Sequence, residues 1–231
     1  MSRVILFRML LSTIFTSMNY QLSYYNYIGN ELFNIANWQF NAYLSIERYN
    51  ELLKENKDYI VVHKPAGLAT QTARLGEKDL VSEIRNHFFL AGDKNSSVSV
   101  INRLDQPVKG IVLFAKDSTT AAKLSAQHKS DSLNKYYLAT VFGHPTNQEG
   151  ELKHFVKKLP SSNVSCVCSP DDKEGKLARL LFKVVKSDEF PSLLDIKLIT
   201  GRHHQIRLQL SDIGCPILGD LKYGTDESIA F

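Results

Sequence analysis

Asn102-Arg103-Leu104-Asp105 is one half of the pattern that decides the fold, and Gly201-Arg202-His203-His204-Gln205-Ile206-Arg207 is the other. Residues two apart in an extended segment point the same way, so we expect Arg103 and Asp105 to share a face while Leu104 turns into the core. The second stretch brings further cationic and imidazole groups to what we expect to be the start of a helix. Together the two stretches would frame one anionic nucleophile or base inside a positive pocket, which suits a phosphate-bearing substrate.

Composition places the chain among globular proteins, since 43% of its 231 residues are hydrophobic and 23% are charged. The length supports one sizeable core. The net charge of +4 is compatible with RNA binding, but a solvated lysine-rich surface gives the same total. The three cysteines, Cys166, Cys168 and Cys215, cannot supply the four ligands of a structural zinc site. We therefore expect a reduced, cytoplasmic chain without structural metal.

Residues 1–50 differ from the rest of the chain. They contain no lysine, all three methionines and nearly half of the aromatic residues. An apolar run at 4–18 is interrupted by Arg8 and is shorter than the roughly 20 residues of a membrane span. We predict an accessory or poorly ordered extension at 1–50 and a main domain at 51–231.

The periodicity of the main domain predicts an α+β fold with a mixed, mainly antiparallel sheet and flanking helices. Alternating or β-branched runs indicate strands at 59–63, 98–101, 111–115, 136–142, 151–156, 177–185 and 193–199. Apolar stripes with caps indicate helices at 79–90, 117–129 and 203–213. The Arg-Leu-Asp segment then lies at a strand end or in a loop.

Four motifs occur in the order found in one known family. They are Val61-Val62-His63-Lys64-Pro65-Ala66-Gly67-Leu68, Arg103-Leu104-Asp105 with 110–116 behind it, 135–143, and 200–208 continued by 213–224. In these motifs the chain resembles the RluA-type family of RNA pseudouridine synthases, from about 58 to 224. The resemblance implies the catalytic fold of that family for the main domain.

The chain also departs from this family pattern. Asn102 stands where the family usually has His, and Val108-Lys109-Gly110 stands where it has Thr-Ser-Gly. Neither change touches the carboxylate of Asp105. Relatives generally continue by a further strand or two beyond the position of Phe231, so we expect the catalytic domain to lack its last C-terminal elements.

The resemblance implies an isomerase that converts uridine to pseudouridine in RNA, with Asp105, Tyr137 and Arg207 as the catalytic residues. Arg207 would orient the Asp105 carboxylate by a charge-assisted pair. Tyr137 would stack under the uracil, whereas its neighbour Tyr136 must face the opposite way in a strand. Three routes stay open for Asp105: attack on C1′ of the sugar, addition to C6 of the ring, or proton removal that leads to a glycal.

RNA contacts are expected from basic residues near these stretches, namely Arg103, Lys64, Lys109, Arg202, His203 and the pair Lys157-Lys158. Arg103 can fill the gap left by an extruded base, or pair with Asp105 itself. The expected partner is structured rRNA or tRNA, the expected assembly is a monomer, and no cofactor, metal or membrane is implied.

Two other readings stay open. A catalytically silent RNA-binding module could keep the same fold, although a pure binder has no reason to keep a carboxylate among phosphates. A metal-dependent hydrolase could be built on His203, His204 and Cys215. Adjacent histidines on a helix point about 100° apart, which makes them poor ligands for one ion.

Overall fold

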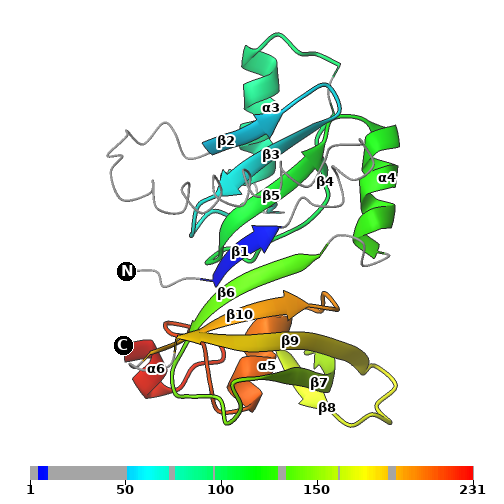
Figure 1. Ribbon diagram of the computed structural model, residues 1–231. Helices are drawn as coiled ribbons and strands as arrows, with labels where there is room; N and C mark the ends of the chain where they lie inside the picture. Colours follow the sequence, from blue (N-terminus) through cyan, green and yellow to red (C-terminus); the bar gives the residue numbers. More distant parts are fainter. Residues whose placement is uncertain are drawn as a thin grey trace, which may run out of the picture.

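The structure is a computed structural model that describes residues 5–9, 51–72, 76–95, 97–129, 134–160, 162–186 and 191–230. It has an α+β fold with a mainly antiparallel sheet and few helices, as the sequence predicts (Figure 1). The strands are β1 Ile5–Met9, β2 Glu51–Glu55, β3 Tyr59–Lys64, β4 Ser99–Val100, β5 Lys109–Ala115, β6 Lys135–Val141, β7 Glu149–Lys158, β8 Ser165–Cys168, β9 Lys176–Lys186 and β10 Ser192–Leu198. The helices are α3 Leu80–Leu90, α4 Ser118–Lys129, α5 Gln205–Asp212 and α6 Asp226–Ala230.

The strands join in one sheet with the order β2-β3-β5-β1-β6-β10-β9-β7-β8, and β4 pairs with β5 beside this path. Within the described strands, the β1–β5 pair is parallel and the other pairs are antiparallel. Figure 1 shows β6 crossing the middle of the molecule, with α3 and α4 beside the strands on one side and α5 and α6 beside those on the other. The Asp105 segment and α5 therefore belong to opposite halves.

Local sequence explains why α3 begins and packs as it does. Asp79 caps the helix by accepting from the Ser82 N–H at 2.7 Å, and the Ser82 hydroxyl accepts from the Asp79 N–H at 3.1 Å. Leu80, Ile84 and Phe88 are all buried, which confirms the predicted apolar stripe. The helix thereby covers the core formed by β3 and β5.

The core has two parts. The larger cluster runs along the central strands and includes Ile60, Phe114, Leu194 and Ile196, each at most 1% exposed. A smaller cluster joins Val156 of β7 and Ala178 of β9 to Leu208 of α5. This second cluster seats α5 on the sheet, and with it the basic residues at the start of the helix.

The sequence does not predict β1, β2, β8 or α6. Of the expected extension at 1–50, only Ile5–Met9 are described, and their backbone pairs with β5 and β6 inside the sheet. The rest of that expectation falls outside the described residues. None of the helices in the described ranges is both long and apolar enough to cross a bilayer.

Candidate active site

Asp105 lies in the connection between β4 and β5, and buried polar contacts fix this connection. The Asn102 side chain, 5% exposed, clamps the backbone of β5 by donating to a carbonyl at 3.1 Å and accepting from an N–H at 2.8 Å. The hydroxyl of Thr70 donates to the Leu104 carbonyl at 2.9 Å and accepts from the Leu104 N–H at 3.2 Å. Asn102 therefore holds the loop that carries Asp105. The resembled family usually has His at this position, and the contacts show that another polar side chain can hold the loop.

The side chains of this connection alternate as the sequence predicts. Leu104 is buried, whereas Arg103 is exposed and Asp105 is half-exposed. Arg103 and Asp105 form no ion pair with each other, although both line the same pocket. The guanidinium of Arg103 is therefore available to a ligand, because it is not committed to the neighbouring carboxylate.

The second stretch forms a tight turn before α5, which begins at Gln205 and not at the expected residue 203. His204 has φ 52° and ψ 27°, a left-handed conformation that is uncommon for a residue with a β-carbon. The Gln205 side chain holds this turn: it accepts from the Thr200 hydroxyl at 2.8 Å and the Arg202 N–H at 2.9 Å, and donates to the Arg179 carbonyl at 3.0 Å. The strained turn places His204 beside Arg207, with both facing Asp105.

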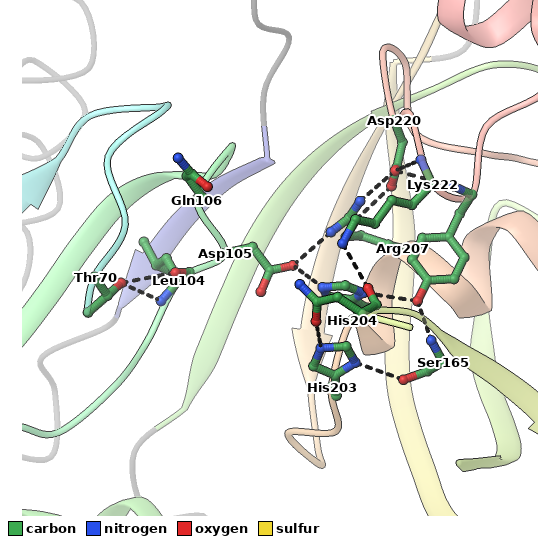
Figure 2. A network of polar contacts seen from close by, with 12 residues as sticks. Thr70, Leu104, Asp105, Gln106, Ser165, His203, His204, Arg207, Asp220 and Lys222 are labelled. Atoms are coloured by element: carbon green, nitrogen blue, oxygen red, sulfur yellow. Dashed lines mark hydrogen bonds and ion pairs between the residues drawn. The ribbon is translucent and has the colours of Figure 1, made fainter. Parts of the chain in front are cut away.

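Arg207 joins the two halves of the site. Its Nη1 donates to Asp105 Oδ2 at 3.1 Å, and its Nε and Nη2 donate to the two oxygens of Asp220 at 2.7 and 2.6 Å (Figure 2). Burial alone would raise the pKa of Asp220, but the hydrogen bonds and charge of Arg207 lower it below its ordinary value. Arg207 and Asp220 thus form a buried ion pair, and Nη1 of Arg207 presents a further donor to Asp105.

His204 is the second group that faces the carboxylate, with Nε2 lying 3.7 Å from Asp105 Oδ2. The Tyr223 hydroxyl accepts from the Ser165 N–H at 2.7 Å and lies 2.9 Å from His204 Nδ1, so we assign its proton to this second bond. His204 then carries its own proton on Nε2, toward Asp105. Burial lowers the pKa of His204 to about 4, and the imidazole is therefore neutral at pH 7.

The sequence predicts an RNA contact for Lys64, but the structure buries this side chain. Its side chain is 0% exposed, and Nζ donates to the carbonyls of Pro65, Leu68 and Gln106 at 2.9, 2.6 and 3.2 Å. Burial lowers the pKa of Lys64 to about 8, against the opposing effect of Asp105, so the amine still carries three protons at pH 7. Lys64 ties its own turn to the loop that follows Asp105 and is not a phosphate contact.

These groups surround a pocket of about 300 Å³, at the lower end of the volumes found for small-molecule sites. Its lining includes Arg103, Asp105, Tyr137, His204 and Arg207. The ring of Tyr137 is half-buried, and burial together with the Asp105 charge raises the pKa of its phenol, which stays neutral at pH 7. The pocket can therefore hold one planar base between an aromatic ring and a carboxylate.

Other predicted residues lie outside this pocket or at its rim. Tyr136 is not in the lining and lies near Lys197, whose Nζ is 5.9 Å from the centre of its ring. Lys109 begins β5, is half-buried and does not line the pocket. Arg202 lies at the rim, and His203 faces the neighbouring hollow described below.

Sequence reasoning missed Asp220, Tyr223 and the orientation of His204. Asp220 and Tyr223 lie in one short motif at 213–224, and this motif was the only sequence signal for them. A turn motif does not show which helix its side chains will contact. The stacked rings of His203 and His204, 3.8 Å apart, are hydrogen-bonded to side chains at Asn163, Ser165 and Tyr223. The described residues contain no group of three potential metal ligands, and Cys215 is buried in the main core.

Comparison with known proteins gives a consistent match. Residues 58–212 match the family model described as RNA pseudouridylate synthase. The ribosomal large subunit pseudouridine synthase C of Rickettsia bellii is 33% identical over 181 residues, which are 78% of this chain and 58% of the relative. The dual-specificity RNA pseudouridine synthase RluA of Vibrio parahaemolyticus is 29% identical over 191 residues, covering 79% of this chain and 72% of the relative.

A solved structure, the human RNA pseudouridylate synthase domain containing 4, superposes with a TM-score of 0.66 at 23% identity. The match covers 76% of this chain and 69% of the human one. At this identity the superposition supports the fold alone. The chain spans 58% of the length of its Rickettsia relative, so that relative contains regions beyond the matched part.

Proposed function

Because the chain belongs to the RNA pseudouridylate synthase family, we propose that it isomerises uridine to pseudouridine in RNA, with Asp105 as the reacting carboxylate. The observation that carries this proposal is the half-exposed Asp105 held 3.1 Å from the buried Arg207 inside a pocket sized for one base. A carboxylate with no role beyond the surface is solvated by water and needs no buried arginine beside it.

The reaction breaks the bond between N1 of uracil and C1′ of the ribose and forms a new bond between C5 and C1′. The C5 proton is lost, and N1 becomes protonated, so atoms and charge balance without a cofactor. Asp105 can assist by attacking C1′, by adding to C6, or by taking a sugar proton on the way to a glycal. In each route Arg207 and neutral His204 hold the carboxylate in place.

The detached uracil must stay in the pocket while it turns. We assign this task to the ring of Tyr137, which lines the pocket from β6. A neutral phenol suits stacking on a neutral base. The exposed Arg103 at the same pocket would occupy the space left in the RNA or hold the displaced phosphate, which offsets part of the few kcal/mol lost on unstacking.

The proposed substrate is rRNA or tRNA, because the Rickettsia relative is named for the large ribosomal subunit and the Vibrio relative for dual specificity. The proposed working unit is a monomer. The three cysteines are free thiols, as a reducing compartment such as the cytoplasm maintains.

The proposal is tested by mapping pseudouridine in cellular RNA with and without the gene, followed by rescue with the wild type or Asp105→Asn. We expect one or more sites to disappear on deletion and to return only with the wild type. RNA binding without any change in the pseudouridine map would instead identify a catalytically silent binding module.

A further inference from the structure

A second hollow lies beside the Asp105 pocket, between the β7–β8 hairpin and the turn before α5. Its volume is about 570 Å³, and it shares Gly201 and Arg202 with the Asp105 pocket. The stacked imidazoles separate the two spaces: His204 lines the Asp105 pocket, and His203 lines the second hollow. A ligand that leaves the first pocket past Arg202 therefore enters the second.

The second hollow is basic. Lys158, Lys176 and Arg202 line it, are exposed, and have no carboxylate partner among the described residues. Lys157 also lines it but is paired with Asp172 at 2.5 Å. Among the described residues of the lining, the exposed Glu174 alone carries the opposing charge. The net charge of the residues that line the hollow is therefore positive, and the hollow favours an anion.

The His203 imidazole, on the side of the second hollow, adds no positive charge at neutral pH. Burial and the nearby Lys158 lower the pKa of His203. Its ring is held by the Ser165 hydroxyl at 2.9 Å (Figure 2). The Asn163 side chain holds it as well, at 2.9 Å. Apart from this imidazole, the described residues that line the hollow include no aromatic ring on which a base could stack. Its chemistry is therefore that of a phosphate site and not of a base site.

We propose that the second hollow binds a phosphodiester group of the RNA strand next to the uridine held in the Asp105 pocket. This inference rests on the proposed function, because it needs a polynucleotide in the first pocket. Lys158 and Lys176 neutralise the phosphate, and Arg202 at the shared rim guides the strand from one space to the other. The contact supplies affinity and registers the strand without reading its sequence.

The test uses the full chain and a fluorescent oligouridylate as the probe. The double variant Lys158→Gln with Lys176→Gln removes two charges but keeps most of each side-chain stem. The matched control is Lys57→Gln with Lys94→Gln, which removes two lysines that are also exposed but lie outside the hollow. Binding is followed by anisotropy over a range of salt concentrations, and folding by thermal unfolding.

In single strands each lost phosphate contact lowers the slope of log affinity against log salt by about 0.7. We therefore expect the double variant to bind at least about threefold more weakly at moderate salt and to lose up to about 1.4 in slope, while the control stays at the wild-type value. Glu174→Gln removes the opposing charge and should tighten binding. This second variant keeps the test decisive if the double variant folds poorly.

Turnover separates this inference from the proposed function. With RNA from a strain lacking the gene, the double variant should raise KM and leave kcat near the wild-type value. Equal slopes and equal KM in the double variant and the control would overturn the phosphate site while leaving the synthase intact. A wild-type protein that makes no pseudouridine, but whose oligouridylate binding follows the charges of the hollow, would instead remove the proposed function.

Discussion

Asp220 holds the guanidinium of Arg207 through two hydrogen bonds of 2.7 and 2.6 Å, with both side chains buried. A bidentate pair of this kind fixes the plane of the guanidinium. One donor of Arg207 then points at Asp105, 3.1 Å away. The reacting carboxylate is therefore oriented before RNA arrives, and the cost of arranging it falls on folding and not on the reaction.

Removing Asp220 should release Arg207. We expect Asp220→Ala to lower the free energy of unfolding by about 3–5 kcal/mol, because it leaves a buried charge without its partner. Turnover should fall by about tenfold or more, since the donor to Asp105 loses its fixed plane. Chemical denaturation and single-turnover kinetics measure the two effects. Asp212→Ala removes a more exposed carboxylate, one near His154, and should cost less than about 1 kcal/mol. Wild-type turnover in Asp220→Ala would show that Arg207 needs no second carboxylate.

Exchanging the reacting group should separate binding from chemistry. Asp105→Asn keeps the size of a half-exposed side chain, so we expect a change of less than about 1 kcal/mol in stability and little change in oligouridylate binding. Pseudouridine formation should drop below detection, because an amide cannot act as nucleophile or base. Mass spectrometry of treated RNA measures the product. Substantial residual turnover would require another carboxylate.

The sequence was sufficient for the elements that have strong local signals. The strand at β3, the capped helix α3 and the contact between Asp105 and Arg207 all follow from periodicity, capping and the family motifs. The signals for β3 and α3 are local. The contact between Asp105 and Arg207 is predicted from the family resemblance, which includes both stretches. The register of β6 also follows, since strand alternation separates Tyr137 from Tyr136.

Other parts depend on tertiary context that no local pattern contains. In the sequence, Lys64 cannot be told apart from a lysine on the surface. Only the fold shows that three carbonyls converge on its amine. The apolar periodicity predicts His204 on a regular helix, whereas the Gln205 contacts impose a left-handed turn that brings it toward Asp105. The edge strand β8 has only four residues, too few for a clear alternation.

The amine of Lys64 should matter for stability first and for turnover second. Lys64→Met leaves the carbonyls of Pro65 and Leu68 without the amine, and leaves the Gln106 carbonyl with the Gly67 N–H as its donor; we expect a loss of at least about 2 kcal/mol. Turnover should fall as well, because the Gln106 carbonyl adjoins the reacting Asp105. Lys57→Met, in an exposed turn, is the matched control for the same side-chain change and should behave as wild type. A Lys64→Met protein as stable as the control, but weaker in RNA binding, would restore the phosphate role expected from sequence.

Acid should destabilise the protein through His204. Its pKa is about 4 in the folded chain, lowered by burial, and 6.5 is the ordinary value that the unfolded chain retains. Between these values the unfolded state binds more protons, so stability falls as the pH is lowered from about 6.5 to about 4. Above this window both states are neutral at this residue and its contribution is complete.

His204→Asn isolates this effect, because Asn tolerates the left-handed conformation and does not titrate. Denaturation of both proteins across the window gives the difference directly. Relative to the variant, the wild type should lose up to about 3 kcal/mol by pH 4, while the difference stays constant above pH 7. Parallel curves for the two proteins would mean that folded His204 keeps its ordinary pKa and becomes charged in place below about pH 6.5. A wild type that instead gains stability relative to the variant as the pH falls through 7 would mean that Asp105 raises the pKa of His204; the carboxylate would then face two cations, and the neutral hydrogen-bond donor assigned to the site would have to be withdrawn.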